Sequence, residues 1–342
     1  MDAPDTEPDH IRYLVTLAAS LALWAALVFG VNWLVDPLWF DGGNRLGERN
    51  FVYNERVSKL NQLVDAPALD CVVLGDSRVS LLDADRIEGA RCFNLAFAGG
   101  NLRDLERFAG YVEGLGLDLR RVIVGIGMFN FTDQPLPDNA PAFVHAGAPP
   151  PGPLASYFST EIFAFSVRAL LERSPSPIYY DRAFHARILR DPGSYDRNPA
   201  LSEQNWSFFM HPGPFVDERL PMLRRAVSGF GDAQRIGYVP PITASFVLGL
   251  DDEGTLESYV STLHEVAGLF DVFYDFSIPG PTTLDADATF DGQHFYEEVN
   301  HRIAERLNGE ENGFGVEVTA LDLATYRARF LEAVAAARRS GA

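Results

Sequence analysis

The sequence predicts an α/β protein in which helices cover both faces of a five-stranded, mostly parallel sheet, giving three α/β/α layers, with one membrane-spanning helix in front of it. Short apolar runs alternate along most of the chain with longer segments in which apolar residues recur every three or four positions. This is the pattern of buried parallel strands and of the helices that cover them. One long apolar stretch lies near the N-terminus, and one long, initially proline-rich excursion separates the third expected strand from the fourth.

The apolar stretch over residues 13–35 contains no charged side chain and is bracketed by Arg12 and Asp36. As a helix it would extend for roughly 35 Å, enough to cross the ~30 Å hydrocarbon core of a bilayer. A signal peptide has a shorter apolar core followed by a small-residue cleavage site, which residues 31–37 do not offer. We therefore predict an acidic tail over residues 1–12, a transmembrane helix over 13–35 and a juxtamembrane connector over 36–66. The alternative is a buried helix of a soluble domain.

The charges that flank this helix do not fix its orientation. Arg12 is the one basic residue other than His10 before the helix, whereas Arg45, Arg49, Arg56 and Lys59 follow it, so the positive-inside rule alone would leave the main domain in the cytoplasm. Large domains, however, cross membranes largely regardless of charge. We expect a single pass through the cytoplasmic membrane with the main domain in the periplasm, and a cytoplasmic domain is the alternative.

The main domain is expected over residues 67–342. Strands are predicted at 70–74, 91–95, 122–126, 235–239 and 271–276, and helices at 102–115, 256–270, 296–307 and 321–338. The segment from about 131 to 231 is too long for a simple crossover, and we predict a helical insertion there with helices at 155–172 and 218–230. In such a fold, ligands bind beyond the carboxyl ends of the parallel strands.

Aromatic residues are frequent in the predicted insertion. They could line a groove for sugar rings or form the core of the insertion itself, and the second interpretation is the simpler one. The residues are Tyr157, Phe158, Phe163, Phe165, Trp206, Phe208 and Phe209.

The net charge excludes one class of partner, and the two cysteines raise the question of a disulfide. The formal net charge of -19 argues against a nucleic-acid partner, because binding to phosphate backbones depends on clustered Lys and Arg. Cys71 and Cys92 each begin an apolar run. A disulfide between neighbouring strands is conceivable, but we expect two buried thiols that pack as small hydrophobic side chains.

Two short motifs carry the chemistry. Gly75-Asp76-Ser77 follows the apolar run 71–74, which places a serine at the carboxyl end of a predicted strand. The second motif, residues 291–294, contains Asp291 and His294 three residues apart. A serine needs a base to become a nucleophile, histidine ordinarily titrates near pH ~6.5, and a carboxylate can orient the imidazole. Together these residues predict acyl transfer with Ser77, His294 and Asp291 as the catalytic residues.

The order of these motifs resembles that of the SGNH (GDSL-type) hydrolase superfamily over about residues 68–310. The matching segments are Gly75-Asp76-Ser77, residues 94–99 with the sequence Asn-Leu-Ala-Phe-Ala-Gly, and residues 291–294. The resemblance implies a flavodoxin-like sheet, Ser77 as nucleophile, and an Asp291 and His294 pair that activates it. It also implies an oxyanion hole that includes the backbone amides of Ser77 and Gly99, and it implies no cofactor.

The third motif of that superfamily is Gly-x-Asn-Asp, and its Asn completes the oxyanion hole. Residues 125–128 here read Gly-Ile-Gly-Met and lack it. Asn130 is the nearby substitute, although it lies beyond the expected position, and it could instead cap a loop.

A narrower similarity concerns the membrane-anchored SGNH-like proteins of bacterial exopolysaccharide loci, relatives of the alginate O-acetylation proteins. Its matching segments include Val35-Asp36-Pro37, the Arg78 that follows Ser77, residues 127–131 and Asp275-Phe276-Ser277. The similarity implies a serine acyl esterase or O-acyltransferase that acts on acetyl groups of an envelope glycan or exopolysaccharide, with polysaccharide-assembly proteins as further partners. A catalytically inactive scaffold that binds polysaccharide, and an esterase of lipids or small esters, are the alternatives.

We expect no catalytic role for the other polar residues. We expect Asp76 to be structural, and Arg78 to be either a surface residue or a contact for an anionic substrate. We predict no metal: the acidic run Asp285, Asp287 and Asp291 lacks the glycine and glutamate of a calcium loop. His145, His185, His211, His264 and His301 show no metal-ligand spacing.

Overall fold

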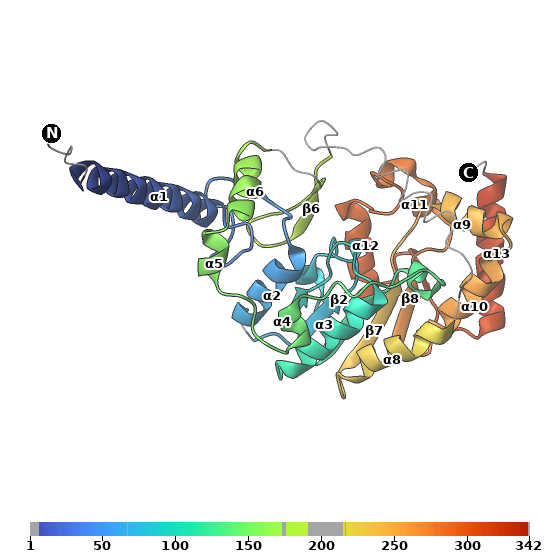
Figure 1. Ribbon diagram of the computed structural model, residues 1–342. Helices are drawn as coiled ribbons and strands as arrows, with labels where there is room; N and C mark the ends of the chain where they lie inside the picture. The colour runs from blue at the N-terminus through green and yellow to red at the C-terminus, as the bar shows by residue number, and fades with distance from the viewer. Residues whose placement is uncertain (1–6, 67, 173–175, 191–214, 216, 341–342) are drawn as a thin grey trace, which may run out of the picture.

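The computed structural model describes residues 7–66, 68–172, 176–190, 215 and 217–340, and its centre is a six-stranded sheet (Figure 1). The strand order is β3-β2-β4-β7-β8-β9, with the first five strands parallel and β9 antiparallel to β8. The predicted α/β class with a mostly parallel sheet is confirmed, and a sixth strand joins the five expected ones. The strands are β2 (Cys71–Leu74), β3 (Cys92–Asn94), β4 (Arg121–Gly125), β7 (Gln234–Val239), β8 (Val272–Asp275) and β9 (Val316–Glu317).

Helices cover both faces of this sheet because its central strands are apolar on both sides. Val72 and Leu74 of β2 belong to one buried cluster, and Cys71 and Val73 belong to another on the opposite face. The first cluster is completed by α2 (Glu55–Asp65), α3 (Leu102–Gly114), α8 (Leu220–Ser228), α9 (Ala244–Asp252), α10 (Leu256–Ala267) and α13 (Leu323–Arg339), and the second by α12 (Glu297–Leu307). Shorter helical elements are α4 (Ala142–His145), α11 (Pro281–Leu284), and the 3-10 turns Ala84–Arg86, Met128–Phe131, Asp217–Arg219 and Ala286–Ala288.

The buried carboxyl group of Asp275 ties the C-terminal helix α13 to the sheet. Asp275 ends β8, and its carboxylate oxygens accept hydrogen bonds from Ser277 Oγ at 2.6 Å and Tyr326 Oη at 2.8 Å. Burial raises the pKa of Asp275 despite these bonds. The Asp-Phe-Ser segment is therefore a packing element in this fold.

Cys71 and Cys92 form a disulfide, so the expectation of two buried thiols was wrong. Strands β2 and β3 pair in parallel with Cys71 directly opposite Cys92, and their Cα atoms lie 4.2 Å apart. The sequence suggested that the two strands could be neighbours, but it did not show that the two cysteines would share one register position.

We expect the disulfide to stabilise the domain by about 3 kcal/mol, because it closes a loop whose ends are 21 residues apart in the sequence. Reduction of the wild type, and the Cys71→Ala/Cys92→Ala variant, should lower the urea midpoint measured in detergent micelles to a similar extent. A wild type that unfolds at the same midpoint with and without reductant would contradict the pairing.

The region between β4 and β7 is mixed, so the prediction of a helical insertion was incomplete. It contains α5 (Pro153–Tyr157) and α6 (Thr160–Leu170), but also β5 (Ile178–Tyr180) and β6 (Ala186–Ile188), which form a small antiparallel sheet with β1 (Asn50–Phe51). The helix expected over 155–172 is divided because Ser159 caps the start of α6. Trp206, Phe208, Phe209 and His211 lie outside the described residues.

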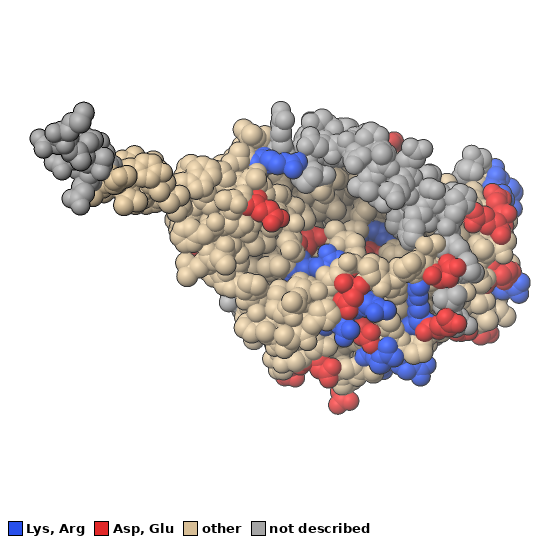
Figure 2. All heavy atoms as spheres, in the orientation of Figure 1, with Lys and Arg blue, Asp and Glu red and all other residues tan. Residues whose placement is uncertain are grey.

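Helix α1 (Glu7–Val35) projects from one end of the domain (Figure 1). Its segment His10–Val35 is long and apolar enough to cross a membrane, and most of its side chains are exposed. On the face visible in Figure 2, charged side chains gather over the main domain and are nearly absent from α1. The helix begins at Glu7, six residues before the predicted start of the span at residue 13.

The connector after α1 is packed against the domain. The carboxylate of Asp36, directly after the helix, accepts hydrogen bonds from the backbone amides of Phe40 at 3.0 Å, Asp41 at 2.7 Å and Gly43 at 3.0 Å, and from Tyr157 Oη at 3.2 Å. These contacts fix the end of α1 to the main domain.

Lys59, the one lysine of the chain, is buried where α2 meets β3 and β5. Its Nζ donates to the carbonyl of Asn94 at 2.8 Å and lies 5.3 Å from the centre of the Tyr180 ring. Burial lowers the pKa of Lys59 to about 8, although the carboxylate of Glu55 opposes this shift.

This buried amine makes stability depend on pH. Between pH 8 and the ordinary lysine pKa of ~10.4, the unfolded chain binds more protons at this site than the folded chain, so its contribution to stability rises with pH. From pH 7.5 to 9.5 we expect the wild type to gain about 2 kcal/mol relative to Lys59→Met in urea unfolding. If the two proteins have parallel profiles of unfolding free energy against pH, the pKa of Lys59 is not lowered by burial as described.

Candidate active site

Ser77 lies in a tight turn at the carboxyl end of β2. The turn is held by Asp76, whose carbonyl accepts hydrogen bonds from the amides of Val79 and Ser80, both at 3.0 Å, and whose Oδ1 accepts from the amide of Arg78 at 2.9 Å. A side chain at position 75 would come within 2.8 Å of the carbonyl oxygen of Gly125, so this close approach to β4 requires glycine. The sequence Gly-Asp-Ser thus places the serine at the start of the turn.

His294 lies in a loop before α12, and Asp291 organises this loop. Asp291 Oδ1 accepts hydrogen bonds from the amides of Gln293 at 3.0 Å and His294 at 2.8 Å. The ring of Phe290 stacks on the imidazole with their centres 5.5 Å apart. The imidazole is therefore held from one side by a carboxylate and from one face by an aromatic ring.

The structure brings Ser77, His294 and Asp291 together although 217 residues separate the first two. Ser77 Oγ lies 2.7 Å from His294 Nε2, and His294 Nδ1 lies 2.7 Å from Asp291 Oδ2. In this arrangement the imidazole can take the proton of the serine hydroxyl while the carboxylate holds the other ring nitrogen. The geometry is that of a serine nucleophile with its base and an orienting acid.

Asp291 is held as a carboxylate. Burial opposes its ionisation, but attraction to His294, the hydrogen bond from that ring and the bonds from backbone amides outweigh burial, and the pKa of Asp291 is lowered. At neutral pH it can accept the Nδ1 proton and stabilise a charged imidazole.

A cavity of about 350 Å³ opens beside the three side chains. Besides Ser77, Asp291 and His294 it exposes polar residues that the sequence did not single out, namely Asn101, Gln134 and Gln293. Gln293 lies inside the Asp-x-x-His motif. Gln134 belongs to no recognisable motif and lines the cavity because it begins the proline-rich segment beside it. The remaining lining residues are Asp76, Arg78, Gly99, Gly100, Phe129, Pro135, Leu136 and Pro137.

Ser77 and Gly99, the residues whose backbone amides are expected to form the oxyanion hole, both line this cavity. Among the described residues, neither amide donates a hydrogen bond to another group. The amide of Ser77 is free because the first residues of a helical turn have no acceptor one turn earlier. Both amides are thus available to an oxygen atom placed near Ser77.

Asn130 has structural contacts and does not line this cavity. Its Oδ1 accepts a hydrogen bond from the amide of Leu102 at 2.8 Å, and its Nδ2 donates to the carbonyl of Gly127 at 3.0 Å. The side chain joins the loop after β4 to the start of α3, and an oxyanion role for Asn130 stays a prediction.

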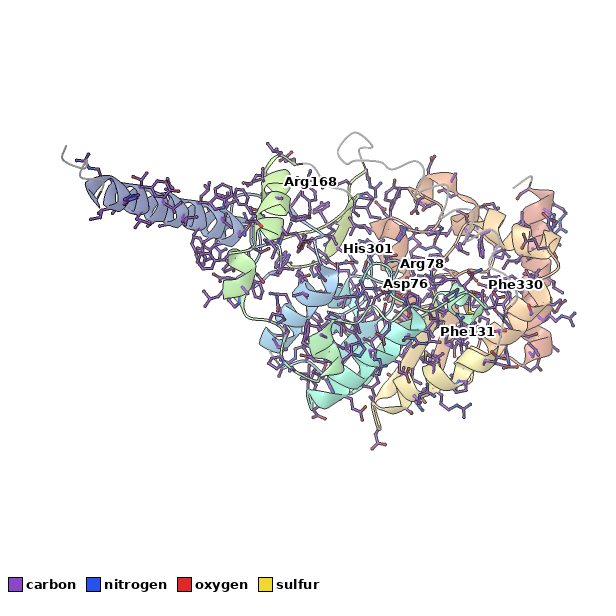
Figure 3. The ribbon with its side chains drawn as sticks, in the orientation of Figure 1. Asp76, Arg78, Phe131, Arg168, His301 and Phe330 are labelled. Carbon is purple, nitrogen blue, oxygen red and sulfur yellow. A yellow bond between two sulfur atoms is a disulfide. The ribbon has the colours of Figure 1, made fainter. Side chains whose placement is uncertain are left out.

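Arg78 is buried, so the expectation of a surface arginine was wrong. Its Nη2 lies 2.5 Å from Asp76 Oδ2, and its Nε donates to Asp76 Oδ1 at 3.3 Å (Figure 3). A Cβ added to Gly127 would lie 1.9 Å from Arg78 Nη2. The guanidinium of Arg78 therefore occupies the space that a side chain at position 127 would need, which explains why this position holds glycine.

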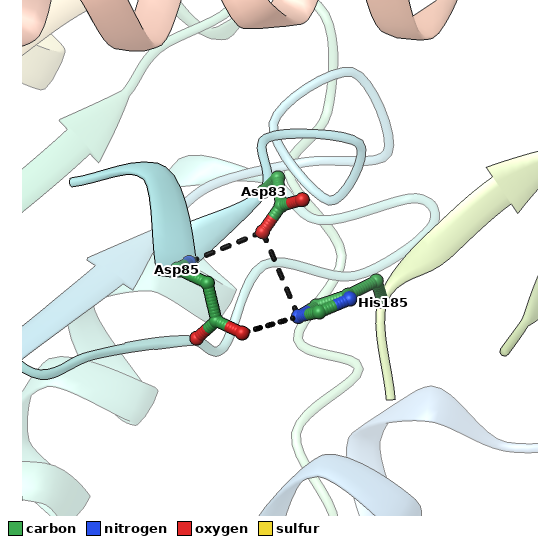
Figure 4. Close-up of side chains that lie close together, drawn as sticks. All are labelled: Asp83, Asp85 and His185. Carbon is green, nitrogen blue, oxygen red and sulfur yellow. Dashed lines mark hydrogen bonds and ion pairs between the residues drawn. The ribbon is translucent and has the colours of Figure 1, made fainter. Parts of the chain in front are cut away.

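A second polar cluster lies apart from this cavity. Ligand-type atoms of Asp83, Asp85 and His185 lie within 4.8 Å of one another, and His185 Nε2 is 3.0 Å from Asp85 Oδ2 (Figure 4). Sequence spacing could not show this cluster because His185 is 100 residues from Asp85. Arg187 joins it through Asp181 at 3.0 Å and Asp83 at 3.8 Å, so the cluster belongs to an ion-pair network between β6 and the 3-10 turn Ala84–Arg86.

Comparisons with known proteins add little to this description. No family model and no curated protein matches the chain. A solved structure described as a "putative platelet activating factor from Streptococcus pneumonia" is similar at 8% sequence identity and a TM-score of 0.32, covering 85% of this chain and 96% of that chain. Because the TM-score is low, this similarity carries no conclusion about fold or function.

Proposed function

We propose that this protein is a membrane-anchored serine acyl esterase or O-acyltransferase of the SGNH type that acts on acetyl groups of an envelope glycan or exopolysaccharide. The observation that carries the proposal is the chain of 2.7 Å contacts from Ser77 through His294 to Asp291 beside a cavity. The sequence order of the motifs supports the same assignment.

In the first half-reaction, Ser77 Oγ attacks the ester carbonyl while His294 Nε2 takes the hydroxyl proton. Asp291 stabilises the imidazolium that results. The negative oxygen of the tetrahedral intermediate accepts hydrogen bonds from the amides of Ser77 and Gly99, where the loss of one such donor costs about 3 to 4 kcal/mol of transition-state stabilisation. His294 then gives its proton to the leaving alcohol, and the acyl group remains on Ser77.

In the second half-reaction, an acceptor hydroxyl gives its proton to His294 and attacks the acyl carbonyl carbon on Ser77. The bond between that carbon and Ser77 Oγ then breaks, and His294 returns the proton to Ser77 Oγ. Water as acceptor completes hydrolysis, and a sugar hydroxyl completes transfer. Both outcomes use the same residues in the same order, so the two activities share one site.

The disulfide supports a periplasmic location for the domain. Disulfides persist in oxidising compartments such as the bacterial periplasm and are rare in the cytoplasm. With α1 as the anchor, the pair Cys71 and Cys92 favours a single pass with the site outside the cytoplasm, where envelope glycans are found.

Specific observations favour the two alternatives. The side-chain amide of Asn130 is already hydrogen-bonded, which would suit an inactive scaffold for polysaccharide. The cavity has an apolar wall formed by Pro135, Leu136 and Pro137, which would suit the acyl chain of a lipid ester.

The experiment uses the purified full-length protein in detergent with p-nitrophenyl acetate, alone and with an acetyl-free oligosaccharide as acceptor. Release of free acetate indicates an esterase, and formation of an O-acetylated oligosaccharide, detected by mass spectrometry, indicates an O-acyltransferase. The Ser77→Ala variant should form neither product. A matched control is Ser258→Ala, which removes an exposed hydroxyl that does not line the cavity.

If the folded wild type forms neither product and also fails to cleave acetylated polysaccharide, the enzyme proposal is contradicted in favour of the scaffold. Cleavage of longer-chain lipid esters with no action on any glycan would favour the lipid esterase.

A further inference from the structure

We propose that α5 and α6 enter the lipid bilayer beside α1, in the leaflet next to the main domain, and form one continuous lipid-facing surface with it. The acyl chains of the membrane lipids cover this apolar surface. The proposal rests on the membrane anchoring by α1 proposed above.

The length of α1 that is free of the domain is too short to cross a membrane. After Arg12, the uncharged stretch up to Trp24, which makes the first aromatic ring contact between α1 and α6, covers residues 13–23, which as a helix extends for only about 16 Å. A hydrocarbon core of ~30 Å needs about 20 residues, and a tilted helix needs more. A span that starts at residue 13 must therefore reach about Asn32.

The last turns of this span are the part that packs on α5 and α6. Trp24 meets Phe163 of α6 edge to face at 5.5 Å, and Phe29 meets Tyr157 of α5 in the same way at 5.5 Å. Because the span must include these turns, the helices packed on them lie at the same membrane depth.

A buried hydrogen-bond network shows that this packing is specific. The amide of Asn32, on α1, donates to the carbonyls of Tyr157 and Ser159, both at 2.9 Å, and accepts from Ser166 Oγ at 3.0 Å. A polar side chain at this depth is costly in lipid unless its hydrogen bonds are made within the protein. The three contacts satisfy Asn32 and hold α5 and α6 against α1.

The outer surface of α6 has the composition of a helix in lipid. Its exposed apolar positions include Ala164, Val167 and Leu170, three residues apart, and the exposed Leu171 follows directly after the helix. This apolar strip adjoins Phe163, one of the residues of α6 that contact α1. Leu171 is 65% exposed and Leu170 41%, a degree of exposure that needs an apolar environment when the residues form one patch.

The charged residues of α6 lie on a second strip, separate from the apolar one. Glu161 and Arg168 are exposed and share a face at a spacing of seven residues, whereas Glu172 lies beyond the end of the helix, where its φ is positive. Glu161 accepts a hydrogen bond from Tyr53 Oη at 2.9 Å, so the start of this strip meets the connector that follows α1; Figure 3 labels Arg168 on the same helix. Separation into an apolar and a charged strip is typical of helices that lie in the membrane interface.

Helix α5 extends the apolar surface on the other side of α1. Leu154 is 69% exposed and Phe158, directly after the helix, is 52% exposed. Phe158 also contacts Phe29 of α1, with ring centres 5.1 Å apart. In Figure 1, α5 and α6 both lie next to the domain end of α1, in agreement with the ring contacts that each of them makes with it.

The test places a single environment-sensitive fluorophore on the full-length protein in phosphatidylethanolamine and phosphatidylglycerol vesicles. The added cysteine is the one free thiol, because the two native cysteines are bonded. The labelled variants are Leu171→Cys for α6, Leu17→Cys for the free part of α1, and Glu332→Cys on α13 as an exposed control. Quenching is measured with doxyl-labelled acyl chains and, separately, with aqueous iodide.

We expect doxyl lipids to quench the label at position 171 by about twofold or more, as at position 17, while iodide quenches only the label at 332. Quenching at 17 without quenching at 171 would overturn this inference and leave the anchor intact. If iodide reaches position 171, that position faces water; if neither quencher reaches it, a protein partner covers α6. A label at 17 that is reached only by iodide would instead contradict the anchoring itself.

Discussion

Replacing Ser77 or His294 by Ala is expected to lower kcat/KM for acetyl-ester cleavage by about 10⁶-fold, and Asp291→Asn by about 10⁴-fold, with little change in stability. The physical reason is that the serine oxygen is a weak nucleophile unless the imidazole takes its proton, and the imidazole is oriented by the carboxylate at 2.7 Å. Steady-state kinetics with p-nitrophenyl acetate check these values.

The pattern across variants is as informative as the size of each loss. Because the three residues act as one unit, the Ser77→Ala/His294→Ala double variant should be no worse than either single variant. His145→Ala, which removes a partly exposed imidazole outside the site, is the matched control and should keep wild-type activity. Losses that multiply in the double variant would contradict a shared catalytic step.

Breaking the buried ion pair behind the nucleophile should have the largest effect on stability. Arg78→Met leaves the carboxylate of Asp76 buried without its charged partner, and we expect a loss of about 3 to 5 kcal/mol in the free energy of unfolding. Because Asp76 also holds the turn that presents Ser77, activity should fall together with stability. Urea unfolding of the full-length protein in detergent measures the first effect.

An exposed ion pair offers a matched control for this prediction. Arg107→Met removes the same type of side chain from a pair with Asp138 that is partly open to solvent, and its cost should stay below about 1 kcal/mol. The Asp76→Leu/Arg78→Met double variant should be less destabilised than the sum of the two single variants. Equal costs for Arg78→Met and Arg107→Met would mean that the Asp76 and Arg78 pair is not buried as described.

The candidate triad could be predicted from sequence because each of its members is tied to a local pattern. Ser77 lies three residues after an apolar run that is typical of a buried strand, and Asp291 and His294 are three residues apart in one loop. Parallel strands present their carboxyl ends at one edge of the sheet, so separate motifs at these ends meet in space. Asp76 was expected to be structural, but its ion pair with Arg78 could not be predicted, since no spacing pattern shows that the guanidinium turns inward to fill the space beside Gly127.

Features that depend on register or on packing between distant segments were not predictable in the same way. The disulfide needs Cys71 and Cys92 at one register position, which no periodicity encodes, and the two-residue strand β9 is too short to show any pattern. The division of residues 155–172 into α5 and α6 follows from the cap at Ser159 and from contacts with α1, which are tertiary.

The most direct test of the account is labelling with a fluorophosphonate probe, which reacts with activated serines, followed by mass spectrometry of the modified peptide. We predict that the folded full-length protein is labelled at Ser77, that His294→Ala strongly reduces the labelling, and that Ser77→Ala abolishes it. A folded wild type that stays unlabelled, or that is labelled at another serine, would contradict the proposal that Ser77, His294 and Asp291 form an active site.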